Sequence, residues 1–228
     1  MSKAKNQNER LKTVGETVSK FEKFLEKNNK AIIIAGGAIV VIIIGIMLYN
    51  NFIRKPKRIE AADSLFKAEE YFEKDSFKLA LNGDGAFPGF LDIIDDYGST
   101  PSGKLANYYA GVCYMRLGEY QNAIDFLKSY SSDDPMVGPM ALCLIGDANM
   151  ELGNHKEALS YYKKAADKAN NDLLSPSFLK KAAQTCEILE DYKQALSLYQ
   201  RIEKDFYGSS EQRDIEKYIE RVKILSEE

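Results

Sequence analysis

Few residues in this sequence are of the types that carry out catalysis or bind metals. The chain has a single histidine, His155, and three cysteines, Cys113, Cys143 and Cys186. Zinc sites combine several such residues at close spacing, and the cysteines here form no C-x-x-C pair and have no second histidine. The sequence also lacks a Ser-His-Asp set, a phosphate loop and a glycine-rich nucleotide motif. It therefore predicts a protein that is not an enzyme and that has no metal or cofactor.

The stretch from Asn82 to Gly85 has a superficial likeness to a calcium loop. It lacks the spaced Asp and Asn ligands and the closing glutamate of an EF-hand. We therefore interpret this stretch as a turn. The cysteines are interpreted as small buried residues, and their odd number is mild evidence against a strongly oxidising compartment. A single disulfide between neighbouring structural units is the alternative.

Residues 31–48 form a run without a charge or a strongly polar group, and the uncharged stretch extends to residue 53. At about 1.5 Å per residue, such a helix can cross a hydrocarbon core of roughly 30 Å. The 30-residue segment before it and the absence of an A-x-A site argue against a cleaved signal peptide. The sequence predicts a transmembrane helix at 31–53, between a leader at 1–30 and a large domain at 54–228.

The charges differ along the chain. Residues 1–50 hold eight basic and four acidic residues, which leaves 23 basic and 30 acidic residues in the remainder. The basic leader favours a cytoplasmic N-terminus, and the large domain is then expected on the other side of the membrane, outside the cytoplasm. An acidic domain argues against nucleic acid as a partner. Basic residues at 54–58 are expected to meet anionic lipid headgroups.

The leader also has one narrow apolar seam, which recurs at spacings of three and four residues. The seam consists of Leu11, Val14, Val18, Phe21 and Leu25. It predicts an amphipathic helix that rests on the membrane, pairs with its own copy in a homodimer, or contacts another membrane protein. A mobile, solvated leader is the alternative.

The large domain contains internal repeats. Gly111, Leu117-Gly118 and Ala123 recur as Gly146, Leu152-Gly153 and Ala158. A third copy has Ala195, but Glu190 stands where the turn glycine is expected. These residues resemble the tetratricopeptide repeat, a pair of antiparallel helices. The resemblance implies an all-α helical-hairpin solenoid with units at about 61–103 (degenerate), 104–138, 139–175 and 176–207.

The repeated spacing has a physical basis. Gly111 and Gly146 are expected where two helices approach too closely for a side chain, opposite Ala123, Ala158 and Ala195. Gly118 and Gly153 are expected to end helices in the left-handed conformation. The exposed end of the last unit needs a cover, and residues 209–226 are predicted to supply it as a capping helix with Ser209 and Ser210 as N-cap residues.

In this family, first-helix residues line a groove that binds proteins. The resemblance assigns that groove here to mainly apolar positions in the first two full units, where methionines suit varied partners. The predicted protein-binding groove consists of Leu105, Tyr108, Val112, Met115, Arg116, Met140, Asp147, Met150, Lys180 and Gln184.

The layout of leader, anchor and repeat domain resembles the YfgM family of ancillary subunits of the Sec translocon. The resemblance implies a single-pass protein of the bacterial inner membrane with a periplasmic repeat domain that meets emerging or unfolded chains as a chaperone-like accessory. Its expected partners are unfolded polypeptide, translocon or envelope complex subunits, and membrane lipid. The alternative is a structural scaffold for an envelope complex that binds one folded partner.

Overall fold

The computed structural model describes residues 27–227, which form helices joined by turns and contain no strand. The chain divides into two units, Met1–Pro56 and Lys57–Glu228, and each is considered by itself. Most of the predicted leader, including its apolar seam, lies outside the described residues.

The first unit contains an apolar helix. Helix α2 (Asn29–Tyr49) is followed by a π-helical segment, η1 (Asn50–Arg54). The side chains of Asn50 and Asn51 accept hydrogen bonds from Arg54 and Lys55 one turn later, at 3.5 and 3.1 Å. The helical run Gly36–Glu73 is long and apolar enough to cross a membrane, and its apolar window is not buried by other parts of the protein.

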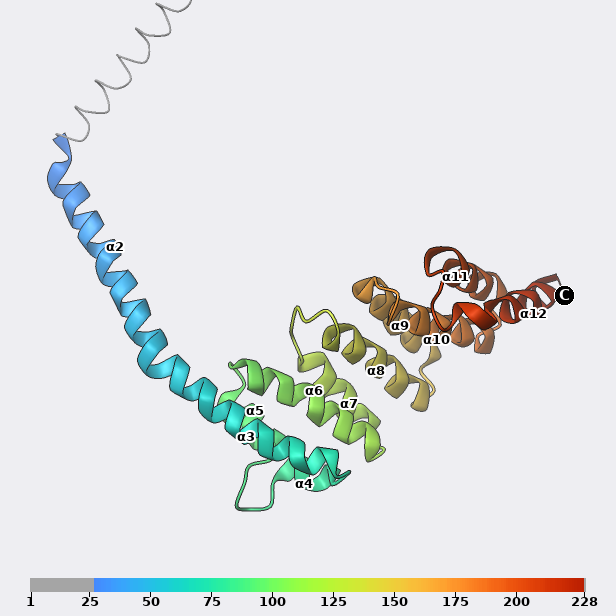
Figure 1. Cartoon of the computed structure of the whole chain (residues 1–228), viewed down its shortest axis with the longest axis horizontal. Coiled ribbons are helices and arrows are strands. Elements are labelled where there is room, and N and C mark those ends of the chain that lie inside the picture. Colours follow the sequence, from blue (N-terminus) through green and yellow to red (C-terminus); the bar gives the residue numbers. More distant parts are fainter. Residues whose placement is uncertain (1–26, 228) are drawn as a thin grey trace, which may run out of the picture. The chain divides into compact units, whose positions relative to one another are not determined.

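The second unit is a series of helical hairpins (Figure 1). From α6 onward each helix packs against the next along the chain. Three clusters of buried apolar residues run through the hairpins, so the core is distributed along the series. The helices are α3 (Lys55–Glu73), α4 (Phe77–Asn82), α5 (Phe90–Tyr97), α6 (Pro101–Arg116), α7 (Tyr120–Ser129), α8 (Val137–Glu151), α9 (His155–Ala169), α10 (Ser175–Ile188), α11 (Tyr192–Asp205) and α12 (Ile215–Glu227).

Four turns of the same kind join the two helices of each hairpin. Each places one residue at positive φ: Asp75, Gly118, Gly153 and Glu190, with φ of 54, 77, 74 and 57°. The residue at positive φ and the residue after it donate backbone hydrogen bonds to the preceding helix, as Gly153 does to Met150 and Asn154 does to Asn149 at 3.0 and 2.8 Å. This is the Schellman pattern, which satisfies carbonyl groups at a helix end. The same backbone turn therefore recurs where the sequence has no glycine.

The two glycines inside the first helices, Gly111 and Gly146, lie where an added Cβ would meet other atoms. A Cβ at Gly146 would lie 2.5 Å from Cε1 of the Tyr162 ring, and one at Gly111 would lie 2.5 Å from Cγ of Leu127. The space is thus taken mainly by a side chain of the second helix rather than by its backbone. Ala123, Ala158 and Ala195 are fully buried on the second helices.

The first hairpin has an interrupted second helix. Helix α4 ends at Asn82, and α5 begins at Phe90 after a loop. Asp84 organises this loop, because its Oδ1 accepts the backbone N–H groups of Ala86 and Phe87 at 2.9 and 2.8 Å. The Tyr71 hydroxyl donates to its Oδ2 at 2.7 Å and is the main cause of the lowered pKa of Asp84. One carboxylate oxygen therefore holds the loop together, and the other ties the loop to α3.

Helix α12 covers the end of the series. Its buried residues Ile215, Ile219 and Val222 join the same cluster as Tyr199 on α11. Its start differs from the prediction, because a short 3-10 segment, η2 (Gln212–Asp214), precedes it. Ser209 Oγ accepts the backbone N–H of Gln212 at 3.3 Å, so Ser209 bonds to the first residue of the 3-10 segment and not to α12.

Replacement of Glu190 by glycine should stabilise the protein. A non-glycine residue at positive φ is strained, and Gly has no such penalty, so we expect a gain of about 0.5–1 kcal/mol in the free energy of unfolding. Urea denaturation followed by circular dichroism measures it. Glu190→Ala removes the same carboxylate but keeps the strain, and it should change little. A gain in the alanine variant equal to that in the glycine variant would show that charge, not backbone conformation, is responsible.

Candidate protein-binding surface

The predicted groove residues lie on the first helices of three hairpins, α6, α8 and α10. They fall into two groups by exposure. Arg116, Met140 and Gln184 are exposed, and Met140 keeps 37% of its surface accessible. The remaining seven are half-buried: Leu105, Tyr108, Val112, Met115, Asp147, Met150 and Lys180.

The apolar members of this surface also pack against the core. Tyr108 and Met115 contact the cluster that contains Ile124 and Ile145, and Met150 contacts the cluster of the next hairpin. The Tyr108 ring lies 5.8 Å from the ring of Tyr130. Burial raises the pKa of the Tyr108 hydroxyl above its ordinary value. Each of these residues therefore offers only part of its surface to a partner.

Asp147 has a structural role that the sequence did not reveal. Its Oδ1 accepts a hydrogen bond of 2.7 Å from the hydroxyl of Tyr162, which is 3% exposed. Lys181, on the first helix of the next hairpin, donates to both carboxylate oxygens at 2.6 and 2.7 Å. Burial, and then the hydrogen bond to Asp147, raise the pKa of Tyr162 well above its ordinary range. The Asp147 carboxylate thus joins two consecutive hairpins.

An equivalent arrangement joins the last hairpin to α12. Glu187 accepts a hydrogen bond of 2.6 Å from the buried Tyr199 hydroxyl, and Arg221 donates to both of its oxygens at 2.7 Å. A third inter-hairpin ion pair links Asp167 to Arg201 at 2.8 Å. In all three pairs the cation follows the acid by 34 residues. That spacing, one repeat unit, is the signal by which the sequence could have shown them.

Lys180 and Gln184 have different surroundings on α10. The Lys180 ammonium lies 4.9 Å from the centre of the Tyr218 ring on α12, a cation–π contact. Gln184 is exposed. The structure therefore gives Lys180 a partner within the protein and leaves Gln184 accessible to other molecules.

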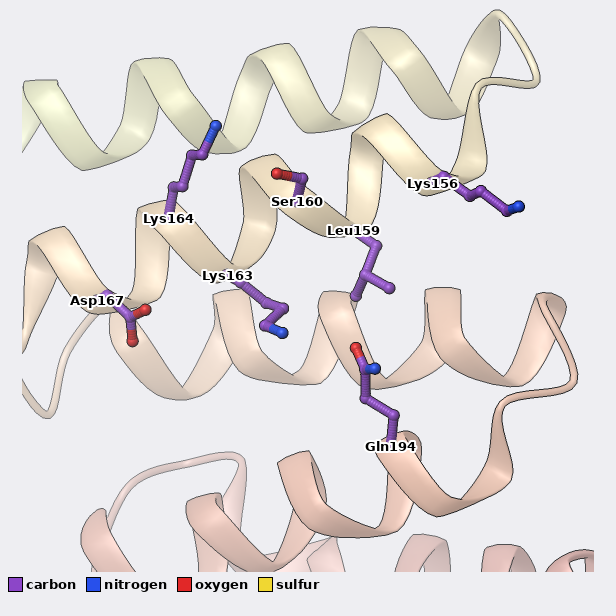
Figure 2. Close-up of a pocket in the computed structure, with 7 residues that line it drawn as sticks. All are labelled: Lys156, Leu159, Ser160, Lys163, Lys164, Asp167 and Gln194. Atoms are coloured by element: carbon purple, nitrogen blue, oxygen red, sulfur yellow. The ribbon is translucent and has the colours of Figure 1, made fainter.

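Two surface hollows involve the second helices, and the smaller one is also lined by Gly138, Ala141, Leu142 and Ile145 of the first helix α8. The α7–α9 hollow, of about 250 Å³, includes Leu127, Tyr130, Tyr161 and Lys168 among its lining residues. The α9–α11 hollow, of about 370 Å³, is lined by Lys156, Leu159, Ser160, Lys163, Lys164, Asp167 and Gln194. Figure 2 shows Leu159 of α9 and Gln194 of α11 directed toward one another, with Lys163 beside them. The repeat pattern points to the first helices alone, so the sequence did not predict either hollow.

The cysteines and the histidine lie within the helical packing. Cys113, Cys143 and Cys186 are free thiols, buried on three different helices. Burial raises their pKa values to about 12, 12 and 11. His155 is half-buried at the start of α9, and its Nδ1 atom has no hydrogen-bond partner among the described residues.

Two segments of the chain, residues 105–135 and 143–210, match family models for the tetratricopeptide repeat. These segments form tetratricopeptide repeats. Such repeats are generally protein-interaction modules, so binding of proteins is the activity that this fold supports. A comparison with curated protein sequences gives no significant match.

Among solved structures, one titled "Crystal structure of MamA protein" is similar to this chain. The two share 15% sequence identity at a TM-score of 0.49, and the match covers 73% of this chain and 92% of that one. A likeness of this size carries no conclusion about partners.

Replacement of Asp147 by alanine should loosen the joint between two repeats. The change leaves the buried Tyr162 hydroxyl without its acceptor, which costs about 1–3 kcal/mol of unfolding free energy. The exposed part of the Lys181 ion pair adds little. Urea denaturation of Asp147→Ala, Tyr162→Phe and the double variant measures the coupling. The free energy of unfolding should fall less in the double variant than the sum of its decreases in the two single variants. Strict additivity of these decreases would contradict an energetic role for this hydrogen bond.

The three thiols should resist alkylation in the folded protein. A thiol with a pKa of about 12 has roughly a thousandth of its population as thiolate at pH 9, whereas an unfolded thiol is about half ionised there. Iodoacetamide labelling counted by mass spectrometry should therefore be slow without urea and fast with it. Because the folded pKa values are raised, these groups stabilise the fold below about pH 9 and lose that effect as the pH rises toward 12. Fast labelling of the folded chain would contradict this burial.

Proposed function

We propose that this chain is a single-pass membrane protein whose tetratricopeptide repeats bind polypeptide segments along their first helices. The observation that carries the proposal is the row of half-exposed apolar side chains on α6 and α8, within repeats of a type that generally binds proteins. The chain would act as a chaperone-like accessory factor rather than as an enzyme.

The membrane part of the proposal rests on composition. The apolar helical run near the N-terminus is long enough to span a bilayer. Eight basic residues in the leader favour a cytoplasmic N-terminus, which would place the repeats in the periplasm of a bacterial cell. Three free, buried thiols are compatible with this placement, because burial slows their oxidation.

Binding would use reversible burial of a partner's apolar side chains. Tyr108, Val112, Met115, Met140 and Met150 keep part of their surface accessible. Each 100 Å² of apolar surface removed from water contributes about 2.5 kcal/mol, before the cost of ordering the partner. Partial exposure of each residue therefore favours weak, reversible contacts. Flexible methionines suit partners of different shape.

The Sec translocon is the proposed place of action. The support for it is the layout of leader, anchor and repeat domain, which resembles the YfgM family. Anchoring beside the channel would raise the effective concentration of the repeats near emerging chains, so a weak groove would be sufficient. Its partners would be unfolded polypeptide and translocon or envelope complex subunits.

A scaffold that binds one folded partner is the second candidate. The observation in its favour is that Asp147 and Lys181 pair with each other between hairpins, and Glu187 pairs with Arg221. These contacts fix neighbouring units and suit a rigid surface of defined shape. In this case the leader or the span could also hold two copies together.

Substitution of Met115 and Met150 by glutamate should abolish binding of apolar peptides. Charges on this surface would have to be desolvated against the partner, which costs several kcal/mol. The measurement is fluorescence anisotropy of several unrelated apolar peptides with the full chain in detergent. Met136→Glu is the matched control, because Met136 is 38% exposed but precedes α8 and lies outside the groove. Unchanged binding in the double variant would place the binding site elsewhere.

Site-specific crosslinking from Tyr108 or Met150 in native membranes separates the two candidates. Many different crosslinked chains indicate a chaperone-like groove, and one abundant product indicates a scaffold. Recovery of translocon subunits would support the proposed place of action. Their absence from the products of both positions would contradict it.

A further inference from the structure

The exposed side of α9 carries a group of lysines that takes no part in the proposed groove. Its four lysines, Lys156, Lys163, Lys164 and Lys168, are all exposed. None of them forms an ion pair with another residue in the described range 27–227. Three of them line the α9–α11 hollow. Helix α9 also carries two exposed acids, Glu157 and Asp167, so its four lysines leave it with an excess of positive charge. An anion bound there would relieve the repulsion among the lysines.

The acidic residue in the lining of this hollow does not neutralise the lysines. Asp167 is paired with Arg201 of α11 at 2.8 Å, and Arg201 also contacts Asp205 at 3.8 Å. Arg201 therefore serves two carboxylates, and the cluster of Asp167, Arg201 and Asp205 carries one net negative charge beside the three lysines of the hollow. The hollow keeps a local positive charge although residues 51–228 hold 30 acidic and 23 basic residues.

The hollow also offers groups that suit a polypeptide. Leu159 gives an apolar surface near the middle of the hollow, and Lys163 and the Gln194 amide lie beside it (Figure 2). The Ser160 hydroxyl can donate a hydrogen bond, and the Gln194 amide, which already donates to Asp191 at 3.3 Å, has one further N–H. The lysine stems add apolar surface next to their charges. A segment that carries both carboxylates and apolar side chains matches this combination, and a simple inorganic anion uses only part of it.

We propose that the outer side of α9 is a second docking surface, which binds an acidic segment of a partner protein. The carboxylates of the segment lie on Lys156, Lys163 and Lys164, and an apolar side chain enters the α9–α11 hollow over Leu159. This surface is separate from the first-helix groove, because its residues come from α9 and α11. The acidic surface of the domain as a whole disfavours nucleic acid at this position.

The test measures binding of two fluorescein-labelled peptides to the full chain in detergent. One peptide contains glutamate and leucine, and the other has each glutamate replaced by glutamine. Lys163→Ala combined with Lys164→Ala should raise the Kd for the glutamate peptide about tenfold, a loss that two exposed ion pairs together can supply. The same peptide should bind more weakly as salt rises, and the glutamine peptide should bind weakly throughout.

The matched control is Lys78→Ala combined with Lys104→Ala, which removes the same charge from exposed residues on α4 and α6. It should leave the Kd unchanged. An equal rise in the Kd of both double variants would mean that the peptide is attracted nonspecifically by positive charge, and it would overturn the proposal. Unchanged binding in the Lys163 and Lys164 variant would also overturn it.

Two further measurements distinguish a peptide-docking surface from a simple anion site and from a lipid-binding surface. Inorganic phosphate that displaces the peptide as well as free glutamate-leucine peptide does would indicate a simple anion site and overturn the proposal. Vesicles that contain phosphatidylglycerol and bind through Lys163 and Lys164, without any binding of the peptide, would overturn it in favour of lipid. The variant with glutamate at Met115 and Met150 should bind the acidic peptide as the unchanged protein does. The α9 surface is therefore tested independently of the proposed groove.

Discussion

The joint between successive hairpins is the constraint on which the second unit depends. A single hairpin cannot bury its apolar face, so each must meet the next in a fixed orientation. At two joints a buried tyrosine fills the space between helices, and its hydroxyl needs an acceptor. Asp147 serves Tyr162, and Glu187 serves Tyr199. Because each acid also binds a cation 34 residues later, the interaction that satisfies the core also orients the following helix.

This arrangement divides the surface into two chemically different sides. The joints take Asp147 of α8 and Lys181 and Glu187 of α10 into internal contacts. The other half-buried groove residues of α6 and α8 are apolar or aromatic: Leu105, Tyr108, Val112, Met115 and Met150. On the second helices the corresponding pair, Asp167 with Arg201, involves none of the four lysines of α9. Two of these lysines have internal contacts that leave their charge uncompensated: Lys164 lies 5.0 Å from the centre of the Tyr161 ring, and Lys168 donates to the Ser132 carbonyl at 3.5 Å. The difference between the two sides follows from which residues the joints use.

The repeats could be predicted from the sequence because they depend on local constraints. Gly111 and Gly146 mark close contacts, and the Leu-Gly turns mark helix ends, so the all-α hairpin fold follows from short patterns. Short patterns do not identify the ion pairs, because many acids and cations are present; the signal is instead the 34-residue spacing between each acid and its cation, which reflects how far each hairpin is displaced from the next. The α9–α11 hollow could not be predicted for a related reason, since a hollow forms where the side chains of neighbouring helices leave a space between them, and that depends on how the helices pack. The conformation of Glu190 could not be predicted from its residue type either, because the turn imposes the positive φ and glutamate by itself disfavours it.

If the proposed groove and the proposed α9 surface bind one partner, neither surface has to be strong by itself. Once the partner touches one of them, contact with the other becomes intramolecular, and its strength is set by effective concentration as well as by affinity. Half-buried groove residues and exposed lysines each give modest energies, because the first offer little area and the second are screened by water and salt. Two such surfaces on one rigid series of hairpins can nevertheless hold a partner well if it reaches both. Rigidity is then the property that matters, and it is supplied by the same acid, tyrosine and cation contacts that close the joints.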